Sequence, residues 1–151
     1  MFGGWGSGKT RGAAAAFLLG ALENPWPPAY GDDQPFSYVI ASTFKVLRDS
    51  AYREFKQVCP PQLVLREWQA PSYELILVNG HRIKFRTAKG AIEGASACFV
   101  WIDEAHLIRS PEVYWNYQAR ARDPRGARRG VIVSGLPCVG WLQELFDHAD
   151  E

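Results

Sequence analysis

The stretch that decides the fold is Gly3-Gly4-Trp5-Gly6-Ser7-Gly8-Lys9-Thr10, near the start of a chain of 151 residues. It fits the pattern G-x-x-x-x-G-K-[ST], in which backbone N–H groups wrap the phosphates of a nucleoside triphosphate. The glycines allow backbone conformations closed to other residues and let the chain approach the anion closely. A following helix presents its positive N-terminal end to the same phosphates. The sequence therefore predicts a nucleotide-binding loop that opens a helix.

Two side chains of this stretch have predicted roles of their own. Lys9 would reach the β- and γ-phosphates of ATP, and the Thr10 hydroxyl would bind Mg²⁺. The alternative is a flexible glycine-rich segment without a ligand. The whole set predicted to bind nucleotide is Gly3, Gly4, Trp5, Gly6, Ser7, Gly8, Lys9 and Thr10.

An acidic pair follows an uninterrupted apolar run at residues 98–102. Such a run is typical of a strand buried on both faces of a parallel sheet. Asp103 is predicted to hold Mg²⁺, and Glu104 to orient and polarise the water that attacks the γ-phosphate. Lys9 and Glu104 are thus the predicted catalytic residues, and Thr10 and Asp103 the predicted metal ligands. An ordinary acidic turn after a strand is the alternative, and His106 either links nucleotide state to neighbouring segments or is structural.

A second apolar run, residues 131–133, ends in Ser134. A small hydroxyl residue at the end of such a strand is suited to sensing the γ-phosphate and transmitting its loss. A plain strand-to-loop turn explains Ser134 nearly as well on its own, so the assignment depends on the order of the three motifs.

The remaining pattern alternates strands with helices. Helices are predicted at residues 10–23, 43–58, 111–122 and 140–149, and strands at 36–42, 63–68, 73–78, 81–87, 98–102 and 130–134. Asn79-Gly80 predicts a tight hairpin. The predicted fold class is a single three-layer α/β domain over residues 1–151, with a mainly parallel RecA-like sheet and a β-hairpin add-on.

Composition limits the functions that the chain can have. The formal net charge is +1, so contact with nucleic acid requires a local basic patch. Three well-separated cysteines match neither a disulfide framework nor a zinc site, and buried thiols are expected. No apolar run reaches the ~18 residues of a membrane span, which predicts a soluble, intracellular protein that is not secreted.

One local basic patch stands out between residues 120 and 129, with a single carboxylate, Asp123, among its charges. Guanidinium groups pair bidentately with phosphate oxygens, so the cluster suits DNA contact or an arginine offered to the nucleotide of a neighbouring subunit. A solvated basic loop is the alternative. The cluster consists of Arg120, Arg122, Arg125, Arg128 and Arg129.

Taken in order, the phosphate loop, the acid pair with Ala105-His106, and Ser134-Gly135-Leu136-Pro137 resemble the N-terminal ATPase domain of tailed-phage terminase large subunits. Trp141 and Leu145-Phe146 continue the likeness, which covers nearly the whole chain. The resemblance implies an ASCE-type P-loop motor that uses ATP and Mg²⁺ to drive double-stranded DNA into a procapsid. It also implies a homo-oligomeric ring, a portal protein and a small terminase subunit as partners, and the host cytoplasm as the location.

The chain departs from that family in three respects. We expect no nuclease domain and no strand before the phosphate loop, since 151 residues that begin at Met1-Phe2 leave no room for either. Some members place an arginine shortly before the acid pair to act on a neighbour's ATP, whereas residues 92–95 here read Ile-Glu-Gly-Ala, so that arginine is unassigned. Two other functions stay open: a DEAH-box helicase lobe, whose signature Asp103 to His106 spells, and a catalytically silent nucleotide-binding fragment.

Overall fold

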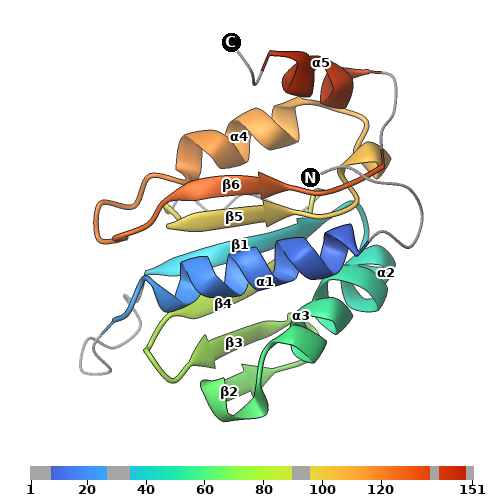
Figure 1. Cartoon of the computed structure of the whole chain (residues 1–151). Helices are drawn as coiled ribbons and strands as arrows, with labels where there is room; N and C mark the ends of the chain where they lie inside the picture. Colours follow the sequence, from blue (N-terminus) through green and yellow to red (C-terminus); the bar gives the residue numbers. More distant parts are fainter. Residues whose placement is uncertain (1–7, 27–34, 90–95, 137–139, 149–151) are drawn as a thin grey trace.

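The computed structural model describes residues 8–26, 35–89, 96–136 and 140–148. Within these ranges, six strands form one sheet in the order β2-β3-β4-β1-β5-β6 (Figure 1). No helix in the same ranges is long and apolar enough to cross a membrane. The strands are β1 (Phe36–Ala41), β2 (Val64–Trp68), β3 (Glu74–Leu77), β4 (Arg82–Thr87), β5 (Phe99–Ile102) and β6 (Gly130–Val133).

The sheet is mainly parallel, as predicted. β4, β1, β5 and β6 run in one direction, and β3 and β2 extend the β4 edge as antiparallel neighbours. The predicted hairpin joins β3 to β4, and Gly80 supplies its turn with a φ of 86°. β4 is therefore both half of the hairpin and a full member of the parallel sheet.

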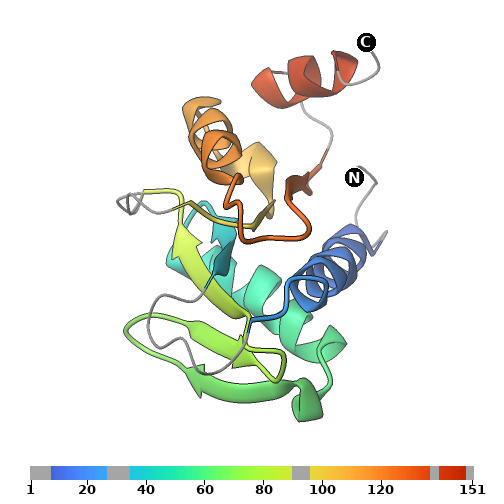
Figure 2. The same ribbon diagram turned by 90° about the vertical axis from the view of Figure 1, so that its left-hand side faces the viewer.

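Helices cover both faces of the sheet, which gives three layers (Figures 1 and 2). The apolar core is divided accordingly into two clusters, one on each face. The helices on the first face are α1 (Lys9–Leu22), α2 (Phe44–Val46) and α3 (Arg53–Val58), and those on the second are α4 (Glu112–Arg120) and α5 (Trp141–Asp147).

The central strands are buried on both faces because their side chains alternate between the two clusters. In β1, Val39 packs in the cluster with α1, whereas Tyr38 and Ile40 pack in the cluster with α4. In β5, Trp101 faces α1, and Val100 faces α4. This double burial explains why both strands read as continuous apolar runs in the sequence.

The helix predicted at residues 43–58 exists, but it is not uniform. Thr43 caps α2 by accepting a hydrogen bond from the Val46 amide, and a π-helical segment, η2 (Leu47–Tyr52), connects α2 to α3. Apolar spacing cannot distinguish a π-helical insertion from a regular helix, so this feature was not predicted. The other elements match the prediction to within one or two residues among the described residues, except that residues 61–63 form a 3₁₀ turn before β2.

A buried histidine links β1 to the segment after α1, at the end of the sheet where the parallel strands begin. His81 is fully buried, its Nδ1 donates to the Asn24 carbonyl at 3.0 Å, and its Nε2 accepts from the Ser37 hydroxyl at 2.7 Å. Because a carbonyl can only accept, this pairing fixes the neutral tautomer. Burial lowers the pKa of His81 to about 4.

The lowered pKa of His81 predicts a loss of stability in acid. As the pH falls below the unfolded-state pKa of 6.5, the histidine is protonated in the unfolded chain, whereas in the folded chain it stays neutral down to about pH 4. The free energy of unfolding therefore falls between pH 6.5 and pH 4. The loss attributable to His81 is about 3 kcal/mol. Urea denaturation of the wild type and of His81→Gln at pH 7.5, 5.5 and 4.5 measures it. Equal pH dependence in the two proteins would contradict the assignment.

Candidate functional site

The predicted phosphate loop leads into α1 at the end of the sheet where the parallel strands finish. Gly8 caps α1 in a left-handed conformation, with φ 72° and ψ 14°, and its carbonyl accepts from the Gly12 amide at 2.8 Å. Lys9 is 8% exposed, and Thr10 follows in the first turn. The first turn holds no acidic residue, so its positive end is available to an anion. Gly3, Gly4, Trp5, Gly6 and Ser7 lie outside the described residues.

Asp103 lies at the centre of the site. It follows β5 directly, is completely buried, and its amide donates to the Ile40 carbonyl of β1 at 2.8 Å. Three hydroxyl groups from three different elements donate to its carboxylate. They are Thr10 Oγ1 at 3.3 Å and Ser134 Oγ at 2.7 Å, both to Oδ1, and Ser50 Oγ at 2.7 Å to Oδ2.

Burial and these hydrogen bonds have opposite effects on the pKa of Asp103. Desolvation is the larger, so the pKa is raised above its ordinary value, and the hydroxyl groups of Ser134, Ser50 and Thr10 partly offset it. A carboxylate held in this way is stabilised further by any cation that approaches it.

Glu104 and His106 connect the acid pair to the segment after β6. Glu104 adopts a left-handed conformation, with φ 51°, and its Oε2 lies 3.4 Å from His106 Nε2. His106 Nδ1 accepts from the Leu136 amide at 3.1 Å, so a neutral ring carries its proton on Nε2, facing Glu104. A Cβ at Gly135 would lie only 3.2 Å from His106 Nδ1 and from the Ala105 amide nitrogen, so the absence of a side chain there permits this close approach.

The structure brings four of the predicted site residues together and adds two that sequence reasoning missed. Thr10, Asp103 and Ser134 share one hydrogen-bond network, and Glu104 is next in the chain. The additional residues are Ser50, from η2, and Trp101, whose indole N–H donates to Ser134 Oγ at 2.9 Å. The only sequence signal for Ser50 was a polar residue adjoining the buried stripe of its helix.

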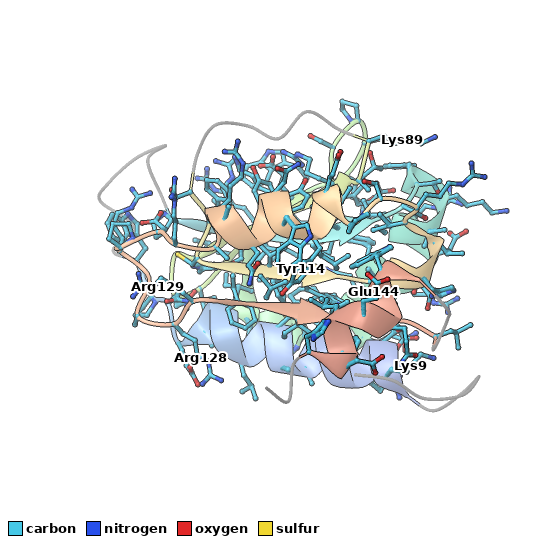
Figure 3. The ribbon with its side chains drawn as sticks, turned by 90° about the horizontal axis from the view of Figure 1, so that it is seen from above. Lys9, Lys89, Tyr114, Arg128, Arg129 and Glu144 are labelled. Atoms are coloured by element: carbon cyan, nitrogen blue, oxygen red, sulfur yellow. The ribbon has the colours of Figure 1, made fainter. Side chains whose placement is uncertain are left out.

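The predicted arginine cluster is not part of this site. Figure 3 shows Arg128 and Arg129 at one end of the molecule and Lys9 at the other. Arg128 lies beside Asn24, beyond the C-terminal end of α1, where its backbone amide donates to Asn24 Oδ1 at 2.8 Å. Within one chain, Arg128 and Arg129 are therefore separated from Lys9 by the length of α1.

The donors at Asp103 fit a magnesium ion bound together with phosphates. A hydroxyl and a carboxylate oxygen, from Thr10 and Asp103, lie 3.3 Å apart, and Mg²⁺ prefers hard oxygen ligands of this kind. Among the described residues, no group of three or more His, Cys, Asp or Glu side chains could enclose a metal ion.

The fold and the site together define a class. A helix that begins at a Gly-Lys-Thr sequence on one face of a mainly parallel sheet, beside a strand that ends in an acid pair, is the arrangement of the RecA-like P-loop fold. The two buried thiols within the described residues, Cys59 and Cys98, are free, as expected.

Comparison with known proteins gives the family. Residues 1–130 match the family described as terminase large subunit, T4likevirus-type, N-terminal. Since the match covers most of the sequence, the chain belongs to this family. No curated protein matches the sequence.

Solved structures share the fold at low sequence identity. The chain is similar to the large terminase of a thermophilic bacteriophage in complex with ATP-gamma-S, with a TM-score of 0.60 and 15% identity over 97% of this chain and 36% of that one. The ATPase domain of the Thermus phage P74-26 large terminase gives a TM-score of 0.57 and 17% identity over 95% and 61%. The HK97 bacteriophage large terminase gives 0.61 and 18% over 95% and 31%. The chain thus spans about a third to three-fifths of the length of these proteins.

Asp103→Asn is expected to stabilise the protein in the absence of metal, because it removes a carboxylate whose pKa is raised by burial. The same change should weaken stabilisation by Mg²⁺ with ATP at least about tenfold in ligand concentration, as loss of a metal ligand does. Thermal denaturation in EDTA and in a Mg²⁺–ATP titration measures both effects.

Asp123→Asn is the matched control, because its hydrogen bonds from Arg125 lower the pKa of that buried carboxyl instead. The control should lose stability and keep its response to Mg²⁺ with ATP. Destabilisation of Asp103→Asn in EDTA would contradict the interpretation of the site.

Proposed function

We propose that this chain binds and hydrolyses ATP as the motor domain of a terminase large subunit that drives double-stranded DNA into procapsids. The observation that carries the proposal is the shared hydrogen-bond network at Asp103. It joins a residue of the phosphate-loop helix, Thr10, to the end of the acid-pair strand and to Ser134 after the neighbouring strand. Membership of the terminase family supports this function over a DEAH-box helicase lobe.

Each residue has a role that follows from its position. Lys9 and the amides at the start of α1 bind and orient the phosphates. Thr10 and Asp103 would hold Mg²⁺, which neutralises the charge of the β- and γ-phosphates when bound. Glu104 accepts the proton of the attacking water, since its carboxylate is next to Asp103 but only partly buried. Nuclease activity is not proposed for these residues.

His106 and Ser134 are suited to transmit the loss of the γ-phosphate from the nucleotide site to the segment after β6. Ser134 donates to Asp103 and accepts from Trp101, and its carbonyl accepts from the Ala105 amide at 2.9 Å. His106 bridges Glu104 and the Leu136 amide. A change at Glu104 when the γ-phosphate leaves would thus alter contacts on both sides of Gly135. In the assembled packaging machine, the portal protein, the small subunit and copies of this chain in a ring are the proposed partners.

Glu104→Gln should retain ATP binding and lose hydrolysis. The amide keeps the size of the side chain but cannot accept the proton, so kcat is expected to fall about 10²- to 10⁴-fold, with the Kd for ATP changed by no more than about twofold. Fluorescent-nucleotide binding and phosphate release, each with and without double-stranded DNA, measure these quantities.

Two variants complete this experiment. Lys9→Ala should lose ATP binding itself, and Glu112→Gln, which neutralises an exposed carboxylate in the first turn of α4, should behave as wild type. Tight binding without turnover in the wild type would favour a catalytically silent nucleotide-binding module. Equal losses of binding and turnover in Glu104→Gln would remove Glu104 from the role of base.

A further inference from the structure

The loop between α4 and β6, residues 121–129, lies at the end of the domain opposite the nucleotide site. α1 has 14 residues, which corresponds to a length of about 21 Å. Lys9 begins α1, and Arg128 is hydrogen-bonded to Asn24, two residues beyond its end (Figure 3). The loop therefore cannot reach phosphates held by its own chain, and any anion that it binds belongs to another molecule or another subunit.

Hydrogen bonds to neighbouring segments hold the backbone of this loop at both of its ends. Asn24 holds the amide and the carbonyl of Arg128 with its side chain, at 2.8 Å each, and its Nδ2 also donates to the Gly20 carbonyl at 2.9 Å. At the other end of the loop, Ala97 donates to the Arg120 carbonyl at 2.8 Å and accepts from the Asp123 amide at 3.0 Å. The arginine side chains thus start from defined positions, which reduces the entropy lost when they bind.

The one carboxylate of the loop is turned inward. Asp123 is 2% exposed and accepts from the Arg125 guanidinium, with Nη2 to Oδ2 at 2.7 Å. Arg125 also lies over the ring of Trp26, at 5.4 Å from its centroid. Arg125 neutralises the negative charge of Asp123 inside the fold. The Asp123 carboxylate therefore does not neutralise the arginines that face solvent.

Three arginines remain directed to solvent. Arg122 and Arg129 are exposed and make no ion pair with any described residue. Arg128 pairs with Glu23 at 3.1 Å, but both side chains are at least half exposed, and such a pair contributes little. Because the formal net charge of the whole chain is only +1, this concentration of positive charge is a local feature.

We propose that loop 121–129 is a contact site for the phosphate backbone of double-stranded DNA, made by Arg122, Arg128 and Arg129. This inference rests on the proposed function, since it assigns the DNA contact of that motor. A duplex presents one charge per about 1.7 Å of its axis, which can engage several guanidinium groups at once. A neighbouring subunit's ATP would take one inserted arginine, whereas here three exposed arginines lie around one rigid turn.

The test is a comparison of two double variants of the full chain with equal loss of charge. Arg122→Gln with Arg129→Gln alters the loop, and Arg53→Gln with Arg66→Gln removes two exposed positive charges near the opposite edge of the sheet. Fluorescence anisotropy with a labelled 30-base-pair duplex of random sequence, at several KCl concentrations, gives the Kd and its salt dependence. ATP hydrolysis without DNA is measured alongside.

The loop variant should bind the duplex about tenfold or more weakly near 0.1 M salt, and the slope of log K against log salt should fall by about 2, for two lost phosphate contacts. The control variant should bind as the wild type does, and both should keep the hydrolysis rate measured without DNA and the thermal stability of the wild type. The proposed function is tested separately, by comparing ATP hydrolysis in the wild type with that in Lys9→Ala.

Three results would overturn the proposal. One is a wild-type chain that does not bind duplex DNA, even if it hydrolyses ATP. Another is an equal loss of affinity in the loop variant and the control, which would mean that general charge, not this loop, attracts DNA. The third is unchanged DNA binding with a loss of hydrolysis in the loop variant, which would assign the arginines to the nucleotide of a neighbouring subunit.

Discussion

The constraint on which the rest of the site depends is the burial of a carboxylate, Asp103, at the meeting point of three elements. Removing this group from water is costly, and the fold offsets the cost with hydroxyl donors from α1, from η2 and from the residue after β6. Each donor can reach Asp103 only if its own segment is correctly placed relative to the C-terminal end of β5. The position of the phosphate-loop helix relative to the sheet is therefore coupled to the charge at the end of β5.

That constraint also accounts for the irregular helix after β1. A π-helical segment adds a residue to a turn and redirects the side chains around it, and Ser50 lies within η2 with its hydroxyl on Asp103. Leu47 and Ala51 of the same segment remain in the apolar core. The segment thus satisfies both the core and the buried carboxylate, and π-helical turns are frequent at functional sites for reasons of this kind.

The sequence predicted the layers, the mainly parallel sheet and the places of Asp103 and Ser134 after buried strands, because apolar runs and turn residues are local signals. It could not predict contacts that depend on tertiary placement. Ser50 and Asp103 are 53 residues apart in the sequence, and His106 and Leu136 are 30 apart. Contacts between residues so far apart produce no periodic pattern in the sequence. The arginine cluster was evident from composition, but its location beyond the far end of α1 required the fold.

A single helix connects the two ends of the domain. α1 begins at Lys9 and Thr10, and just beyond its end Asn24 bonds to Arg128 and to His81. Because Ala13, Phe17 and Ala21 of α1 are fully buried against the sheet, a shift at its first turn cannot be absorbed by bending into solvent. Close-packed interiors transmit such shifts. The same helix thus positions the Thr10 hydroxyl at Asp103 and, through Asn24, the backbone of the loop that holds the exposed arginines.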